Sequence, residues 1–297
     1  MIKRMSRFLS RLELRQLVDS LVLDWSDMAS HTKAMLYYTA QHYLDGKIPW
    51  EMTFEVDRWP DYRAVLWTND VNDASVPTYI KNCLYLHWSN DDGLRQILTS
   101  TSMDWTRQLM LCAFPLRGFS ILKEHLEKQG VHVPYPAEDS TAEEPCDTAY
   151  YLHKTCPSPE KMNTAGEKVI IAPLKPEHSQ LVSKTWKFGG TPAAETYFHF
   201  QISTFPSACV YDQYGKPLSW ILMNYYGSQG VGYTLPDHRG KRYFQLASRQ
   251  LISVCLEKGY LPFLFIEEYN EASRNIHKKL GYTWKEAGRC AYIRINR

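Results

Sequence analysis

The chain has 297 residues, of which 44% are hydrophobic and 22% are charged. This composition is typical of a folded globular protein with one large domain or two ordinary ones, and it excludes a disordered chain. The formal net charge of +2 gives no electrostatic reason to expect a nucleic-acid partner, and no apolar run approaches the length of a membrane span.

The cysteines are scattered along the chain and form no CxxC pair. An odd, dispersed set favours reduced thiols in an intracellular protein over a disulfide framework. His, Cys, Asp and Glu show no spacing typical of metal ligands, so we expect no metal. The cysteines are Cys83, Cys112, Cys146, Cys156, Cys209, Cys255 and Cys290.

The N-terminal segment is basic and has two interpretations. Residues 1–15 contain five Lys or Arg and one acid, Glu13, which is the charge pattern of a weak mitochondrial presequence. The apolar residues Met5, Phe8, Leu9 and Leu12 also recur at helical spacing, which predicts the first amphipathic helix of a domain. Both interpretations stay open, and the expected location is mitochondrial or cytoplasmic.

The first half of the chain has mixed α and β patterning. Helical periodicity covers residues 4–23, 92–98 and 117–129, and residues 62–67 form an apolar strand pattern. Residues 131–166 lose this periodicity and are rich in Pro, acids, Ser and Thr, which predicts a loop or linker. We therefore expect an N-terminal domain over 1–135, a linker over 136–166 and a C-terminal domain over 167–297.

The second half has a clearer pattern. Residues 207–211, 218–224 and 231–235 are strand patterns separated by turn residues, which predicts an antiparallel meander. The period then becomes helical from Phe244 and stops at Gly259. Residues 261–266 are a nearly continuous apolar run, typical of a buried strand, and residues 270–280 are helical and end at Gly281. The sequence therefore predicts an α+β sandwich with a central sheet.

The turn between the third strand and the following helix is basic. It reads Pro236-Asp237-His238-Arg239-Gly240-Lys241-Arg242-Tyr243-Phe244. The first N–H groups of a helix lack partners within the helix, and they lie at the positive end of the helix dipole. A diphosphate can bind there, helped by Arg and Lys side chains. A solvated basic helix start has the same pattern, so the turn alone leaves both interpretations open.

A second motif follows the buried strand. It runs from Asn270-Glu271 to Lys279-Leu280-Gly281-Tyr282, and together with the basic turn it resembles the GNAT superfamily of acyl-CoA-dependent N-acyltransferases. The chain is more closely similar to the glycine N-acyltransferase family. That resemblance rests on residues 186–190, 204–207, 219–220 and 232–236, and, in the first half, on residues 59–62 and 64–65.

The resemblance implies the fold and a binding site. Two GNAT-like domains are expected, each a mixed, largely antiparallel central sheet flanked by helices, with acyl-CoA bound by the C-terminal one. The backbone of Tyr233, Thr234 and Leu235 would pair with the pantetheine amides. Asn270 and Asn275 would lie beside the pantetheine arm. The diphosphate would be held by Arg239, Gly240, Lys241, Arg242, Tyr243 and Phe244.

The resemblance also implies an activity. The protein would be an enzyme, expected to be a monomer, that transfers an acyl group from its co-substrate acyl-CoA to glycine or another small amino acid by direct attack of the amine. His277 stands where the superfamily often has a Tyr that protonates the departing thiolate, and an imidazole N–H can donate to that sulfur.

Two features depart from the family pattern. Arg242 and Phe244 replace a Gly and a small residue in the basic turn. Because a helix start needs negative φ, we expect the turn to keep its shape. Ser228 stands where many members have a glutamate base. A base typically contributes about 10²–10⁴-fold, and Ser228 cannot be that base unaided, so Glu268, Glu267 and His238 are further candidates.

Two alternatives to the amino-acid acyltransferase stay open. The first is a catalytically impaired acyl-CoA-binding protein that kept the fold and lost the base. The second is an acyltransferase that acts on a different amine acceptor, such as a protein lysine.

Overall fold

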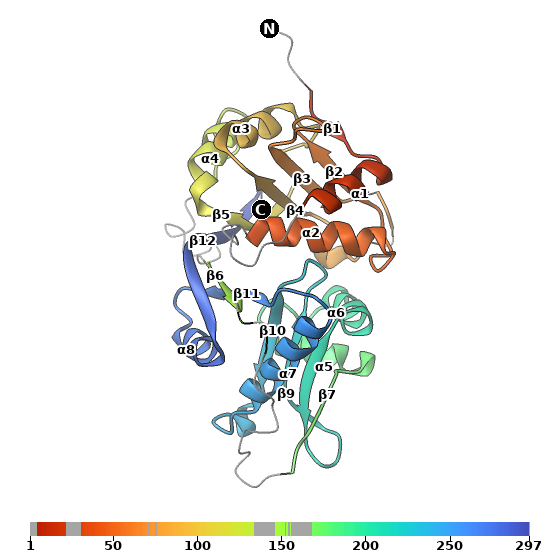
Figure 1. Cartoon of the computed structure of the whole chain (residues 1–297), viewed down its shortest axis with the longest axis vertical. Helices are drawn as coiled ribbons and strands as arrows, with labels where there is room; N and C mark the ends of the chain where they lie inside the picture. Colours follow the sequence, from red (N-terminus) through yellow and green to blue (C-terminus); the bar gives the residue numbers. More distant parts are fainter. Residues whose placement is uncertain are drawn as a thin grey trace. The chain divides into compact units, whose positions relative to one another are not determined.

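The computed structural model describes residues 5–21, 31–70, 72–74, 76–133, 146–151, 153, 155 and 168–296. The chain forms two compact units (Figure 1). The first unit contains residues 1–148, 267–269 and 285–297, and the second contains residues 149–266 and 270–284. The C-terminal strand therefore ends in the unit that is built mainly from the N-terminal half.

The first unit has a mixed sheet. Its strands lie in the order β1 (Arg7–Phe8), β2 (Met52–Val56), β3 (Ala64–Asn69), β4 (Cys83–Trp88), β5 (Leu109–Pro115) and β12 (Tyr282–Ile295). The pair β4–β5 is parallel, and the other pairs are antiparallel. A parallel pair needs a crossover, which here is α3 (Asp91–Ser100).

Helices cover both faces of this sheet. One face presents Leu84, Leu86 and Trp88, which share a core with residues of α3 and of α4 (Phe119–Glu127). On the other face His87 Nδ1 lies 3.0 Å from the hydroxyl of Thr32, which belongs to α2 (His31–Leu44). The alternation of side chains along a strand explains why neighbouring residues serve different layers. Short 3-10 turns occur at Thr78–Ile80 and Leu116–Gly118.

The N-terminal segment packs differently from its predicted pattern. The helix α1 covers Arg11–Ser20, whereas residues 7–8 pair with β2 as a strand. The side chains of Met5, Phe8 and Leu12 are 81%, 52% and 71% exposed. The buried residues of α1 are Leu14, Leu17 and Val18. The prediction of a helix over 4–23 was therefore right only in its centre, and its predicted apolar face was wrong.

The second unit contains the predicted meander. Its strands lie in the order β6 (Cys146–Tyr151), β11 (Phe263–Glu267), β10 (Gln229–Thr234), β9 (Pro217–Met223), β8 (Ser207–Tyr211) and β7 (Ile170–Ala172). The pairs from β7 to β10 are antiparallel, and β10–β11 is parallel. The antiparallel meander, the buried strand that follows it and the α+β class are confirmed, and the structure adds that this strand pairs in parallel with β10.

The helices of the second unit are α5 (Ser179–Thr185), α6 (Pro192–Thr204), α7 (Tyr243–Glu257) and α8 (Glu271–Leu280), with 3-10 turns at Pro176–His178 and Pro236–His238. α7 packs on β8 and β9 (Figure 1). Ile252 of α7 and Leu280 of α8 share a core with Leu264 and Ile266 of β11. The predicted helices over 244–258 and 270–280 are therefore confirmed.

Part of the predicted linker is structured. Residues 146–151 form the buried strand β6, so the prediction of a loop was wrong at these positions. Their sequence, Cys-Asp-Thr-Ala-Tyr-Tyr, contains β-prone residues that the surrounding Pro and acidic residues obscure. Most other positions of the 136–166 segment, including Cys156, lie outside the described residues. No disulfide joins the cysteines that the structure describes.

Candidate functional site

Strand β10 has an open backbone edge. Its pairing with β9 shifts between Gly230 and Tyr233, where Val231 has φ +53°. Its parallel pairing with β11 joins Gln229 to Leu264, and among the described residues it has no further ladder pair on that side. Gly232 is exposed although the strand lies inside the sheet. The bulge in β10, and its single ladder pair with β11, leave main-chain N–H and C=O groups of β10 available to a ligand.

The turn after β10 leads to a helix start without a side-chain cap. Leu235 N–H donates to Leu218 O at 2.9 Å, which holds the end of the strand. The N-cap of α7 is Arg242, whose side chain makes no capping hydrogen bond. The first N–H groups of the helix, starting at Tyr243, therefore point out of the helix at the positive end of its dipole.

Arg242 has a left-handed backbone, with φ +65° and ψ 12°. The expectation of negative φ in this turn was wrong. The N-cap residue precedes the helix and is not bound to helical dihedrals, and here the chain reverses through Gly240, with φ +79°, and Arg242. A left-handed residue with a Cβ costs about 1–2 kcal/mol. The turn is kept at the cost of backbone strain that a glycine would not have.

Basic side chains surround this helix start. The guanidinium carbon of Arg239 lies 5.7 Å from the centre of the Tyr233 ring, and its Nε donates to Thr234 O at 3.4 Å. Arg239 thus lies along the end of β10. Lys241 is half-buried and Arg242 is exposed. Their charges add to the helix dipole and favour an anion at this position.

The corresponding helix start in the first unit has the opposite character. There the crossover helix α3 follows β4, and the side chain of Asn90 accepts a hydrogen bond from Gly93 N–H at 2.9 Å. The first turn contains Asp91 and Asp92. The cap occupies an N–H group and the two carboxylates repel anions. Of the two crossover helices, α7 is therefore the one suited to a diphosphate.

His277 lies on the inner face of α8 and is 4% exposed. Its Nδ1 lies 2.8 Å from the carbonyl oxygen of Ser273 and 3.2 Å from the hydroxyl of the same residue. Its Nε2 is buried and has no hydrogen-bond partner in the part of the chain that the structure describes. Burial lowers the pKa of His277 to about 4. The ring is therefore neutral at pH 7 and has one nitrogen for a ligand.

Aromatic rings enclose His277. The ring of Phe244 stands edge-to-face to it, with centroids 5.6 Å apart, and the ring of Tyr282 does so at 5.3 Å. The Tyr282 hydroxyl donates to the side chain of Gln229, whose Nε2 lies 3.6 Å from Cys255 Sγ. This buried chain connects the first residue of β12 through the start of β10 to α7. The sequence analysis missed Gln229 and Ser273. The spacing of Ser273 and His277, one helical turn apart, was a signal for Ser273. Gln229 had no such signal.

Of three other predicted residues, two have structural partners and one is exposed. The Asn270 side chain caps α8 by accepting from Ser273 N–H at 3.1 Å. Asn275 is exposed and lies about 200° around the helix from His277. Ser228 is fully buried, and its hydroxyl accepts from Asn224 Nδ2 at 2.9 Å. The structure therefore brings Phe244 and His277 together beside Gly232 and leaves Asn275 on another face of its helix.

Glu268 belongs to the first unit. Its carboxylate accepts a hydrogen bond from Arg289 Nε at 2.7 Å, and both side chains are partly exposed. His238 lies in the turn before α7, with its ring 6.3 Å from that of Tyr243. The catalytic role of Glu268 stays a prediction.

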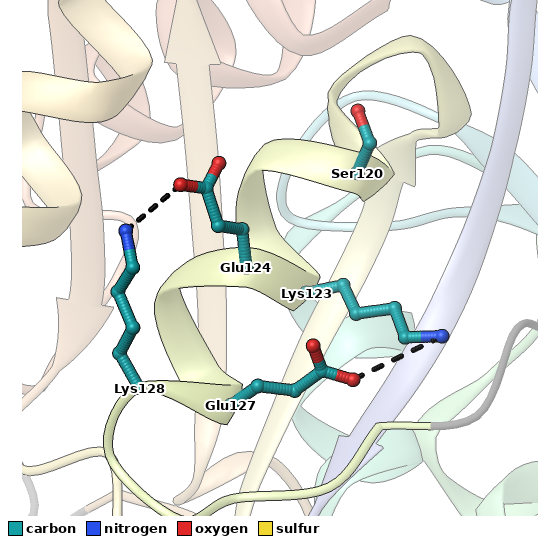
Figure 2. Close-up of a pocket in the computed structure, with 5 residues that line it drawn as sticks. All are labelled: Ser120, Lys123, Glu124, Glu127 and Lys128. Carbon is teal, nitrogen blue, oxygen red and sulfur yellow. Dashed lines mark hydrogen bonds and ion pairs between the residues drawn. The ribbon is translucent and has the colours of Figure 1, made fainter.

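A separate hollow of about 470 Å³ lies along α4 in the first unit (Figure 2). All of its lining residues come from this helix, and they are Ser120, Lys123, Glu124, Glu127 and Lys128. Figure 2 shows that the charged groups pair with one another, Lys128 with Glu124 at 2.8 Å and Lys123 with Glu127 at 3.9 Å. Such exposed i,i+4 pairs are typical of a solvated helix face, so this hollow is not a candidate site.

A family comparison identifies the chain. The family described as aralkyl acyl-CoA:amino acid N-acyltransferase matches residues 35–206, which is more than half of the sequence. The chain belongs to this family. Residues 210–290 match a second family, described as FR47-like protein. Membership places the chain among the acyl-CoA-dependent N-acyltransferases, and it confirms the resemblance found in the sequence.

Relatives of this acyl-CoA N-acyltransferase have low sequence identity but cover most of the chain. The glycine N-acyltransferase of Pongo abelii is 25% identical, over 84% of this chain and 85% of that protein. The glycine N-acyltransferase-like protein Keg1 of Mus musculus is 24% identical, over 84% and 89%. The glycine N-phenylacetyltransferase of Bos taurus is 24% identical, over 69% and 72%.

Solved structures confirm that this acyltransferase has two GNAT-like domains. A Drosophila protein solved by X-ray crystallography has a TM-score of 0.72 at 17% identity, covering 99% of this chain and 100% of that one. A tandem GNAT protein from the clavulanic acid biosynthesis pathway has a TM-score of 0.55 at 11% identity, covering 98% and 97%. At these identities the likeness shows the fold alone.

The described residues of the acyltransferase contain neither a membrane-spanning helix nor a cluster of metal ligands. No helix among them is long and apolar enough to cross a membrane. Within the same residues no group of three or more His, Cys, Asp or Glu side chains is arranged to hold a metal ion.

Proposed function

We propose that the chain transfers an acyl group from acyl-CoA to the amine of glycine or another small amino acid, and that it binds acyl-CoA in its second unit. The observation that carries this proposal is the uncapped, basic start of α7 beside the open edge of β10. The capped, acidic start of α3 in the first unit supports the choice of unit. The family description supports an amino acid as the acceptor.

The proposed binding mode uses main-chain groups along β10 and α7. The diphosphate accepts N–H bonds at the start of α7 and is neutralised by Arg239, Lys241 and Arg242. The pantetheine amides pair with the backbone of Tyr233, Thr234 and Leu235, as an added strand pairs with a sheet edge. The thioester then lies toward the interior, on the side of His277.

The proposed reaction is one direct displacement. The amine nitrogen attacks the thioester carbon, the C–N bond forms, the C–S bond breaks, and the amine loses one proton. In the tautomer whose Nδ1 accepts from the Ser273 hydroxyl, the Nε2–H of His277 donates a hydrogen bond to the departing sulfur, which leaves as the thiolate of CoA. Holding amine and thioester together supplies much of the rate. Glu268 stays the predicted base for the amine.

The test is a screen for released CoA. Purified protein is incubated with acetyl-CoA, benzoyl-CoA and phenylacetyl-CoA, each with every common amino acid and with a lysine-containing peptide, and free thiol is measured. We expect release with glycine or another small amino acid. Lys241→Glu is expected to weaken acyl-CoA binding, whereas Gln250→Ala, further along α7, is the matched control. Release of CoA with the lysine-containing peptide, but with none of the free amino acids, would mean that the acceptor is a protein lysine.

A second candidate is a catalytically impaired acyl-CoA-binding protein. The observation that favours it is Ser228, which is fully buried and hydrogen-bonded to Asn224, at the position where the family resemblance implies a glutamate base. Direct binding by calorimetry, measured on the same preparation as the screen, separates the two candidates. Binding without turnover supports this candidate, and turnover excludes it. Ser228→Glu would place a carboxylate at a buried position, and burying an unpaired charge costs several kcal/mol. The variant would therefore restore turnover at constant affinity only if the fold tolerates this carboxylate.

A further inference from the structure

The ring of Phe244 lies across the candidate site. Phe244 is in the first turn of α7. A methyl group added at Gly232 of β10 would lie 2.5 Å from Cε2 and 2.9 Å from Cζ of this ring. The same ring stands edge-to-face to His277 of α8. Phe244 therefore touches the open strand on one side and the buried histidine on the other, and it fills the space between them.

This position conflicts with a bound co-substrate. Under the proposed function the pantetheine arm runs along β10 past Gly232, and its thioester reaches His277. The ring of Phe244 occupies that path, and two groups cannot share it, because packed interiors have no spare volume of this size. The buried Nε2 of His277 also has no hydrogen-bond partner among the described residues, and a buried nitrogen favours a polar partner.

We propose that Phe244 is a gate to the acyl-CoA cleft. The inference rests on the proposed function. In the closed state the ring lies against the side of Gly232 where a Cβ would be, and against His277. In the open state its side chain adopts another rotamer, and the half-buried position of Phe244 leaves solvent on one side for that movement. Acyl-CoA then binds the open state only, and its apparent affinity is reduced by the fraction of molecules that are open.

The first test is binding. The dissociation constants of CoA and of benzoyl-CoA are measured for the full chain, for Phe244→Ala, for Phe244→Leu and for the control Gln250→Ala. Minor states are typically populated at 0.1–10%, so removing the gate should tighten binding by about tenfold or more for both ligands. Phe244→Leu should lie between the wild type and Phe244→Ala, and the control should match the wild type.

The second test is the contact itself. Gly232→Ala places a methyl group against the ring, so it should lower the melting temperature of the wild type clearly more than that of Phe244→Ala. This comparison needs no ligand. An equal loss in both backgrounds would mean that the ring does not lie over Gly232, and it would overturn the gate.

Each binding outcome decides a different point. Unchanged or weaker binding by Phe244→Ala overturns the gate. A change that affects benzoyl-CoA but not CoA also overturns it, because the ring would then be a wall of the acyl pocket. If the wild type and all variants bind neither ligand at millimolar concentration, the proposed function has failed, and the gate fails with it.

Discussion

Ser273 offers two hydrogen-bond partners to one ring nitrogen of His277. Nδ1 lies 2.8 Å from the Ser273 carbonyl oxygen, which can only accept, and 3.2 Å from the Ser273 hydroxyl, which can also donate. The carbonyl favours the tautomer with a proton on Nδ1, and the hydroxyl permits the tautomer with a proton on Nε2. The two groups of Ser273 therefore influence which nitrogen of the neutral His277 ring carries the proton, and under the proposed function Ser273 would act as a positioning residue.

The first prediction concerns this hydroxyl. Ser273→Ala leaves the carbonyl as the partner of Nδ1 and should hold the proton there. We expect kcat to fall on the order of tenfold or more, because Nε2 can then no longer donate to the thiolate, with an unchanged dissociation constant for acyl-CoA. The tautomer is read from the nitrogen chemical shifts of the imidazole. The control is Ser203→Ala, whose hydroxyl donates to a helix carbonyl at 2.7 Å in α6. An unchanged tautomer ratio would contradict the prediction.

The second prediction concerns acid stability. Burial lowers the pKa of His277 to about 4, of His31 to about 4 and of His87 to about 3. Because these folded-state pKa values lie below the unfolded value near 6.5, the unfolded chain binds more protons. The stability that these neutral histidines contribute is fully present above pH 6.5, and it is lost as the pH falls from 6.5 toward 3. We expect each histidine to account for a loss of roughly 1–3 kcal/mol of unfolding free energy over this pH range.

Urea unfolding at pH 7, 6, 5 and 4 checks this prediction. The variant His277→Asn should show a shallower loss of unfolding free energy over the same range, even if it is less stable at pH 7. His199→Asn, which replaces an exposed histidine of α6, is the control. Equal slopes for His277→Asn and the wild type would contradict the prediction.

The third prediction separates the backbone of Arg242 from its charge. Because φ is +65°, Arg242→Ala keeps the strain and loses the charge, whereas Arg242→Gly loses both. Arg242→Gly should be more stable than Arg242→Ala by about 1 kcal/mol. Both variants should bind acyl-CoA several-fold more weakly and with less dependence on salt. Thermal unfolding and titrations at two salt concentrations measure these effects. Equal stability of the two variants would mean that the turn does not keep its left-handed residue.

The fourth prediction concerns Glu268. If it is the base, Glu268→Gln should lower kcat by about 10²-fold or more without changing acyl-CoA affinity. Its exposed pair with Arg289 should contribute less than about 1 kcal/mol to stability, so the fold should survive. Glu271→Gln, an exposed acid in α8, is the control. A kcat within twofold of the wild type would remove Glu268 from the mechanism.

Local sequence patterns were sufficient for most of the second unit. The strand Ser207–Tyr211, the helix that ends before Gly259 and the helix that ends before Gly281 were all predicted within a few residues. Periodicity and turn residues act over a few positions, so they can be read without knowing the fold. The basic turn at 236–244 was found for the same reason, because a helix start and its charges are contiguous in the chain.

Distant partners decided the rest. The strand at residues 7–8 forms because Leu9 N–H donates to Phe54 O, and residues 290–295 belong to the first unit because they pair with β5. The left-handed Arg242, the burial of Ser228 beside Asn224 and the contact of Phe244 with Gly232 likewise depend on neighbours that no local pattern contains. The sequence by itself determined where the candidate acyl-CoA site starts. Only the tertiary structure decided what fills it, because the packing of side chains from three different elements sets its volume.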